Sequence, residues 1–399
     1  TSGLSGVSTG SQVLNLVTFV VTQLAMGITV LIARYLGEKR EDQIGSIIGG
    51  GTVVFAAISL VLFVIMVGFA RPIAVLMQAP EEAVGLTVAY IRICGAGIFF
   101  IVAYNVLSAI FRGLGDSNSP LLFVFVACIV NVVGDLVLVA GLGMDAMGAA
   151  LATVFAQALS VVFAIVRLVK KGLPFTITGY DFRWNPQCGK FLQIGLPLAL
   201  QECLTQGSFL ALCAFVNRLG LEASSGYGVA CKIVNFAMLI PSALMQSTSS
   251  FVSQNVGAGE QKRAKKTMFT GIGIGLLVGC FAFSLVFFRG DLLAGIFSAD
   301  AAVVQRGYEY LKGFAPETLL TAVLFSMMGY FNGNGKTVWV MLQGLIQTLL
   351  VRLPFAYYMS IQPDASLTNI GLAAPISTAV GIVLNVAFFL YLEHAAKRS

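Results

Sequence analysis

The sequence predicts an all-α polytopic membrane protein made of two six-helix lobes that arose by internal duplication. Composition is the first observation: the 399-residue chain is 57% hydrophobic and only 11% charged, with a mean hydropathy of +0.89, whereas a soluble domain carries about 25% charged residues. The second is that charge-free runs recur along the chain, as at 43–70 and 267–288. A helix needs roughly 20 apolar residues to cross a bilayer, so each of these runs is long enough.

The third observation is an internal repeat. The stretch FRGLGDSNSP begins at Phe111 and FNGNGKTVWV begins at Phe331, 220 residues later, and the two share Phe, Gly and Gly at the same places. The same offset relates Gly37 to Gly257 and keeps its register from about residue 5 to residue 115. A register held over such a length indicates a duplicated unit.

Eleven helical spans are expected from the apolar runs and the polar turns between them. The first copy supplies 11–36, 44–70, 86–112, 118–141 and 146–169, and the second supplies 190–217, 226–256, 267–289, 304–332, 337–360 and 368–392. The partner of 190–217 would fall before residue 1, so we expect a first helix to be missing from this sequence; a true eleven-helix protein is the alternative. The domains expected are an N-terminal lobe at 1–170, a linker at 171–189 and a C-terminal lobe at 190–399.

The distribution of basic residues predicts the topology. Basic clusters fall in alternate loops, including 34–40, 167–190 and 262–266, and such clusters mark the cytoplasmic side of membrane proteins. The glycine turns and the linker are therefore expected to face the cytoplasm, in a multi-pass protein of the cytoplasmic membrane without a signal peptide. An even number of helices per unit gives both lobes one orientation and a pseudo-twofold axis along the membrane normal.

Several function classes are disfavoured. The seven cysteines are scattered without a C-x-x-C motif, and the one histidine, His394, lies in the C-terminal tail, so we expect no metal centre, no cofactor and no enzyme. The glycine turns do not follow a strand, which favours a structural role over phosphate binding. Two equivalent lobes without an ATP-hydrolysing module favour a secondary transporter with alternating access, driven by a gradient of Na⁺ or H⁺.

Asp135 is the strongest candidate for a functional residue, because an ionisable group inside a membrane helix is costly and usually functional. Asn131 lies one turn earlier on the same face, and Thr153 on the next helix could add a hydroxyl. Together they could bind a proton or a Na⁺ ion; the alternative is that Asp135 only fixes helix packing. Their repeat positions hold Val351 and Phe355 in place of Asn131 and Asp135, and this asymmetry favours function.

The second lobe has its own intramembrane charges. Arg352 needs a partner in lipid, which Glu202 or Glu317 could supply as an ion pair; substrate or cation contact is the alternative. The residues considered for a cavity in this lobe are Glu202, Gln206, Glu317 and Arg352, with Lys232, Gln343 and Gln347 as further polar groups.

The motifs ARYLGEKRED, FRGLGDSNSP, NVVGDLVLV and SQNVGAGEQKRA, in this order, resemble the multidrug and toxic compound extrusion (MATE) family. The resemblance implies a twelve-helix, two-lobed exporter that exchanges organic cations or amphiphiles for Na⁺ or H⁺. It also implies that Asn131, Asp135 and Thr153 line a cation site, with Tyr90 as a further candidate. The repeat partner of Tyr90 is Tyr310, which favours an interfacial anchor instead.

The resemblance also has gaps. An aspartate on the family's first helix has no counterpart in this sequence. Where some members carry acidic ligands on the seventh and tenth helices, Thr205 and Thr321 stand here, with Glu202 and Glu317 about one turn earlier.

The expected partners are a small organic cation or amphiphile and the lipid bilayer, without nucleic acid, and the expected state is a functional monomer. A flippase for a lipid-linked precursor, from the same superfamily, is the alternative; it needs a cationic cavity, and Arg352 and Lys232 are the only deep cations expected. A channel is less favoured, because no repeated pore loop or charged ring is present.

Overall fold

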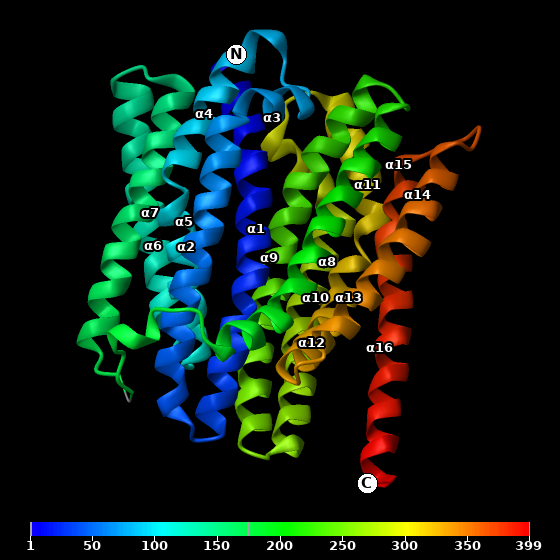
Figure 1. Ribbon diagram of the computed structural model, residues 1–399. Coiled ribbons are helices and arrows are strands. Elements are labelled where there is room, and N and C mark those ends of the chain that lie inside the picture. The colour runs from blue at the N-terminus through cyan, green and yellow to red at the C-terminus, as the bar shows by residue number, and fades with distance from the viewer. Residues whose placement is uncertain (1, 174, 399) are drawn as a thin grey trace. The chain divides into compact units, whose positions relative to one another are not determined.

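The computed structural model describes residues 2–173 and 175–398, and all regular elements in these ranges are helices (Figure 1). The chain divides into two compact units, Thr1–Ala199 and Leu200–Ser399. The division falls within helix α8 (Pro186–Asn217).

The first unit begins with the long helix α1 and ends in the α6–α7 hairpin and the start of α8. Its helices are α1 (Ser2–Gly37), α2 (Ile44–Gly68), α3 (Ala70–Leu76), α4 (Val84–Ala96), α5 (Ile98–Gly113), α6 (Asn118–Asp135), continued by the π-helical segment η3 (Leu136–Gly141), and α7 (Asp145–Lys170).

The second unit contains the rest of α8 and all later helices. These are α9 (Leu221–Gly257), α10 (Gln261–Phe297), α11 (Ala301–Phe314), α12 (Glu317–Gly333), α13 (Thr337–Leu345), the π-helical segment η5 (Ile346–Arg352), α14 (Leu353–Ser360), α15 (Leu367–Gly371) and α16 (Ala373–Arg398).

The expected membrane spans are confirmed. Nine helices of the described chain are long and apolar enough to cross a membrane, and there are 11 when two bent pairs are each counted as one span. The pairs α4–α5 and α11–α12 bend by 54° and 48°. Large apolar side chains stay exposed on the outer helices, as Leu121, Val124 and Phe125 do on α6. This is the surface that a multi-pass membrane protein presents to lipid.

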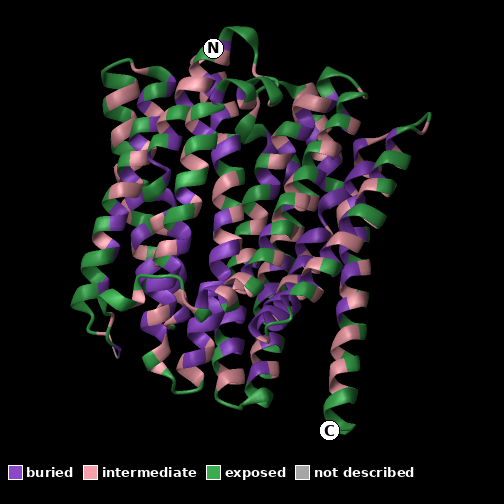
Figure 2. Ribbon diagram, viewed as in Figure 1, coloured by how far each residue is buried: buried purple, intermediate pink, exposed green. Residues whose placement is uncertain are grey.

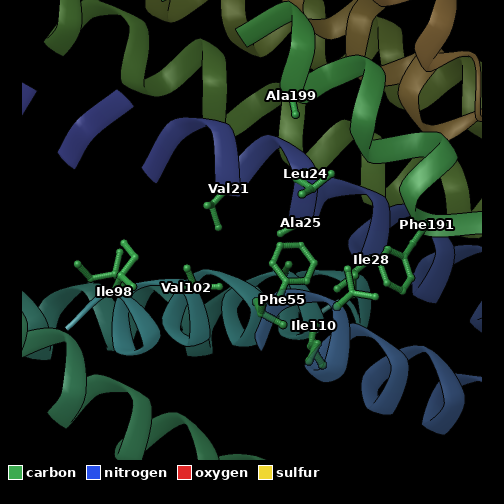
Figure 3. Close-up of a cluster of buried hydrophobic side chains, with 14 of the residues drawn as sticks. Val21, Leu24, Ala25, Ile28, Phe55, Ile98, Val102, Ile110, Phe191 and Ala199 are labelled. Atoms are coloured by element: carbon green, nitrogen blue, oxygen red, sulfur yellow. The ribbon is translucent and has the colours of Figure 1, made fainter. Parts of the chain in front are cut away.

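The core of the first unit lies between α1, α2 and α5. Ile28 of α1 is fully buried and faces Phe55 of α2 and Ile110 of α5 (Figure 3). Phe55 also stacks on Phe191 of α8, with ring centroids 6.5 Å apart. Buried positions gather in the half of these helices nearest the α5–α6 turn (Figure 2), so this half is the tightly packed end of the unit.

The duplication is visible in equivalent close contacts. A Cβ atom placed on Gly113 would lie 2.9 Å from Cβ of Ile32, and one on Gly333 would lie 2.6 Å from Cβ of Val252. Both pairs are related by the offset of 220 residues. Each unit therefore uses glycine at the same point to let two helices approach closely.

The two glycine turns form the same helix cap. Gly115 has φ +79° and Gly335 has φ +75°, a left-handed conformation that glycine adopts without strain. The next amide, of Asp116 or Lys336, donates to the carbonyl of Phe111 at 2.9 Å or of Phe331 at 2.8 Å. This pattern is a Schellman cap, so the repeated loops are structural turns, as the sequence predicted.

The segment between α7 and α8 is bound to the start of α2. The Ser46 hydroxyl donates to Asp181 at 3.2 Å, and the Asn185 amide donates to the carbonyl of Ser46 at 2.9 Å. A Cβ atom on Gly49 would lie 2.3 Å from the carbonyl carbon of Asp181. The end of this segment therefore packs on α2 as part of the first unit.

Candidate functional site

A pocket of 520 Å³ in the first unit contains the leading candidate residue. It is lined by α1, by α6 with its π-helical continuation, and by the start of α7. Its apolar wall includes Val7, Val132 and Val139, and its charged lining residues are Asp135 and Asp145. Asp135 thus faces a space large enough for a small organic molecule.

The structure brings Asn131, Asp135 and Thr153 together, as their spacing predicted. The surroundings of the Asn131 amide assign the orientation in which its nitrogen donates to Oδ2 of Asp135 at 3.2 Å. Its oxygen then accepts from the amide of Thr153 at 3.3 Å and from the Thr153 hydroxyl at 3.1 Å. One side chain on α6 therefore links the carboxylate to α7.

The helices meet closely where this link forms. A Cβ atom on Gly134 would lie 2.8 Å from Cβ of Ala152, so α6 and α7 are in contact one residue away from Asp135 and from Thr153. The π-helical segment starts at Leu136, directly after Asp135. Such local π turns inside α-helices recur at functional sites.

Tyr90 of α4 belongs to the same group. Its ring packs on Gly10 of α1, where a Cβ atom would lie 2.4 Å from Cδ1, and its side chain neighbours those of Thr153 and Asp135. Tyr90 is 4% exposed and its repeat partner Tyr310 is 3% exposed. Both are buried, so neither has the position of an interfacial anchor.

The Asp135 carboxylate has a hydrogen-bond partner at one oxygen and none among the described residues at the other. Asn131 holds Oδ2, whereas Oδ1 is shielded from solvent and has no hydrogen-bond partner among the described residues. A carboxylate in this state can take a proton, or can bind a small cation with help from amide and hydroxyl oxygens. In the described part of the chain no group of three or more His, Cys, Asp or Glu side chains could hold a metal ion.

The candidate residues of the second unit fall into two groups. On α8, the Gln206 amide donates to Oε1 of Glu202 at 2.8 Å. On α12, Glu317 lies at the first helical position after the bend and is only 5% exposed. No hydrogen bond or ion pair of the described residues joins Glu202 to Glu317.

Glu317 is the end point of a buried chain of hydrogen bonds. Gln343 donates to Gln347 at 2.5 Å, Gln347 donates to the Thr378 hydroxyl at 3.1 Å, and Thr378 donates to Oε1 of Glu317 at 2.8 Å. Successive donors pointing toward a carboxylate strengthen one another. Oε2 of Glu317 is buried without a partner among the described residues.

Arg352 makes a different contact from the ion pair expected for it. Its Nε donates to the Ser377 hydroxyl at 3.2 Å, and its guanidinium lies 5.9 Å from the ring centroid of Phe209. The ion pairs of the described residues include none between Arg352 and Glu202 or Glu317. Adjacent residues of α16, Ser377 and Thr378, hold the two charges instead. Neither residue was predicted from the sequence, because neutral Ser and Thr in an apolar helix carry little signal.

Lys232 has an exposed side chain that lies over the Phe297 ring, 5.6 Å from its centroid, so the expectation that this lysine is buried is wrong. Thr205 and Thr321 donate to backbone carbonyls of their own helices, those of Gln201 at 3.0 Å and Glu317 at 2.8 Å. These two hydroxyls are therefore occupied locally.

Comparison with known proteins gives one consistent result. The model of the MatE family matches residues 1–137 and 197–358. The probable multidrug resistance protein YpnP of Bacillus subtilis is 27% identical over 286 residues, which is 71% of this chain and 64% of that protein. The multidrug export protein MepA of Staphylococcus aureus is 26% identical over 333 residues, 80% of this chain and 72% of that protein. The chain thus spans just under two thirds of YpnP and somewhat more of MepA.

Solved structures show the same fold. An outward-facing multidrug resistance MATE family transporter of the MOP superfamily superposes with a TM-score of 0.94 at 21% identity, covering 99% of this chain and 89% of that one. A MOP superfamily transporter from Pyrococcus furiosus, described as having a reverse polarity of the binding pocket that suggests a different function, superposes with a TM-score of 0.92 at 21% identity, covering 99% and 89%.

Proposed function

The chain belongs to the MatE family of multidrug transporters, and we propose that it is an antiporter that exports organic cations or amphiphiles in exchange for Na⁺ or H⁺. The observation that carries this proposal is Asp135, which lines a largely apolar pocket and whose Oδ1 has no hydrogen-bond partner among the described residues. The Asp135 carboxylate can serve the cargo and the coupling ion in turn, which is what exchange requires.

The coupling follows from competition for one negative charge. With Asp135 ionised, an organic cation in the pocket is attracted by about 4 kcal/mol at 4 Å, for an effective dielectric constant near 20. A proton or Na⁺ on Oδ1 cancels that attraction, and the cargo is released. Asn131 holds the Asp135 carboxylate and links it to Thr153 of α7, which fixes the position of the carboxylate for the ion.

The polarity of the pocket favours this cargo over the lipid-linked precursor of the alternative. The charged side chains that line it are the carboxylates Asp135 and Asp145, and no basic residue lines it among those described. Arg352 is held by Ser377 within its own unit, and Lys232 is exposed. A phosphate-bearing lipid head would meet repulsion here. The Pyrococcus furiosus transporter illustrates that this fold also serves pockets of other polarity.

Transport by purified protein in liposomes tests the proposal. A fluorescent organic cation is loaded, a Na⁺ or H⁺ gradient is imposed, and efflux is followed for the wild type, Asp135→Asn and Asp364→Asn. Asp364 is an exposed residue of the α14–α15 loop, so its variant controls for the loss of one negative charge. We expect Asp135→Asn to lose gradient-driven efflux and Asp364→Asn to keep it. Equal efflux by Asp135→Asn and wild type, in protein that melts at the same temperature, would overturn the proposal.

A further inference from the structure

The C-terminal end of α7 carries a second pocket that the proposed transport does not use. It has a volume of 430 Å³ and is lined by Phe163, Val166, Arg167, Lys170 and Lys171. Residues 163, 166, 167 and 170 follow the three- and four-residue spacing of one helix face. The pocket is therefore a stripe with an apolar half and a basic half.

The stripe crosses the boundary of a predicted membrane span. The span Asp145–Lys170 ends at the basic half of the pocket. On the part of α7 that precedes the basic half, the outer surface is apolar and exposed: Val162 is 57% exposed and Val166 is 44% exposed. A lipid lying along α7 would thus place its acyl chain on the apolar half and its head group on the basic half.

The basic half keeps charge that the protein does not neutralise. Lys171 pairs with Asp116 at 2.6 Å, and Asp116 also accepts from the Ser119 hydroxyl at 2.5 Å. Arg167 donates through Nε to the same hydroxyl at 2.7 Å, which orients its guanidinium. Three cations against one carboxylate leave a net charge of +2 at this end of the hairpin.

Two groups are available to an incoming anion. Within the described residues, the side chain of Lys170 makes no hydrogen bond or ion pair, and Arg167 is held only through Nε, so that its two terminal nitrogens point away from that bond. A guanidinium fixed in this way can donate two parallel hydrogen bonds to a phosphate.

We propose that this pocket binds the phosphate of an anionic phospholipid, with Arg167 and Lys170 at the phosphate and an acyl chain along Phe163 and Val166. The apolar half distinguishes a phospholipid from soluble phosphate, which gains nothing from Phe163. The net charge distinguishes an anionic head group from a zwitterionic one, whose ammonium group would meet the same cations. The proposal is independent of the transport function.

Native mass spectrometry of the intact protein tests it directly. The protein is titrated with an equimolar mixture of phosphatidylglycerol and phosphatidylcholine, and bound lipids are counted for the wild type, Lys170→Gln, Arg167→Gln and Lys266→Gln. Lys266 is an exposed lysine in the first turns of α10 and is the matched control. We expect the affinity for phosphatidylglycerol to fall about fivefold for each pocket cation removed. The affinity for phosphatidylcholine should not change, and Lys266→Gln should bind both lipids as the wild type does.

Two further arms identify the source of the phosphate. The Val166→Ser variant keeps every charge of the pocket and should still bind phosphatidylglycerol more weakly than the wild type does. Millimolar inorganic phosphate should not displace phosphatidylglycerol from the wild type. Displacement by inorganic phosphate would overturn the lipid assignment. The assignment would also be overturned if Lys170→Gln bound phosphatidylglycerol as tightly as the wild type. It would likewise be overturned if Lys266→Gln lost as much affinity as the pocket variants, because the lipid would then be attracted to any basic surface. Because Lys170 has no side-chain partner in the described chain, its variant is expected to fold normally, and a thermal melt checks this.

Discussion

Gly97 and Glu317 occupy the same position in the two repeats, and each stands at the bend of a broken membrane helix. The bends are 54° between α4 and α5 and 48° between α11 and α12. In the first unit Val154 of α7 packs against the bend. A Cβ atom on Gly97 would lie only 2.3 Å from Cγ1 of Val154. In the second unit the same bend carries a buried carboxylate. One backbone feature therefore supports close packing in one repeat and a buried acid in the other.

Gly97→Ala should disturb the candidate cation site through packing alone. The new methyl group must displace Val154, which is the neighbour of Thr153, and overpacking of this kind costs about 1–3 kcal/mol. We expect a lower thermal midpoint together with weaker gradient-driven efflux. Gly85→Ala, on α4 with no atom within 4 Å of its added Cβ, is the control and should leave both measurements near the wild type. Similar behaviour of the two variants would contradict this account of Gly97.

Asn131→Ala should change the affinity for the coupling ion more than the affinity for the cargo. The Asn131 amide donates to Oδ2 of Asp135 and so favours the ionised carboxylate; the substitution removes this bond and the link to Thr153, and a hydrogen bond to a charged group contributes about 1.5–3 kcal/mol. When H⁺ is the coupling ion, the H⁺ concentration giving half-maximal efflux should fall about tenfold or more, with a smaller change in the concentration dependence on the organic cation. Equal shifts for ion and cargo would assign Asn131 to general folding of the site.

Thr378→Val should destabilise the second unit. The valine has a similar shape but removes the donor to the buried Glu317, and an unsatisfied buried polar group costs about 1–3 kcal/mol. Thr267→Val, whose hydroxyl bonds only its own helix backbone at Arg263, is the matched control. Thermal unfolding in detergent measures both.

The same network predicts a rescue. Because an amide is cheaper to bury than a charge, Glu317→Gln in the Thr378→Val background should recover part of the lost thermal midpoint. If the double variant is as unstable as the sum of the single ones, Thr378 and Glu317 are not coupled.

Asp116 should make stability depend on acid pH. Burial acts to raise the pKa of this carboxyl group, but the hydrogen bonds from Lys171 and Ser119 outweigh it and lower the pKa from 3.8 to about 2. The stabilisation is therefore complete above pH 3.8 and is lost as the pH falls toward 2.

The measurement is a series of thermal melts across that range. Asp116→Asn should be less stable than the wild type at neutral pH by a constant difference, and the difference should shrink below pH 3.8. Asp42→Asn, an exposed residue whose side chain bonds neutral Gln43, should show no such pH-dependent difference. A difference between Asp116→Asn and wild type that persists unchanged to the most acid pH would rule out the carboxylate as its source.

The features that could be predicted from the sequence are those that depend on residues close together in the chain. The helical spans follow from runs of apolar residues, and the two glycine caps follow from a motif that needs one left-handed residue. The meeting of Asn131, Asp135 and Thr153 was also predictable, because four-residue spacing fixes a helix face and a short turn forces α6 and α7 side by side.

The features that were not predicted depend on contacts between distant helices. Gln347 and Thr378 are 31 residues apart, and Thr378 and Glu317 are 61 residues apart. No local sequence pattern could therefore predict the hydrogen-bond network that ends at Glu317. The exposure of Lys232 was missed for a related reason: in an apolar helix of low amphipathicity, composition does not tell which face meets the lipid or its boundary.

The helix caps at Gly115 and Gly335 show how the two copies of the duplicated unit differ in charge while sharing a backbone. The residues that follow them, Asp116 and Lys336, donate the same backbone hydrogen bond to Phe111 and Phe331 but bear opposite charges. Because a backbone amide makes this bond, the side chain at that position can differ between the halves, whereas a side chain at either glycine would strain a left-handed backbone. Each half could thus acquire its own ionic chemistry while both retained one ancestral scaffold.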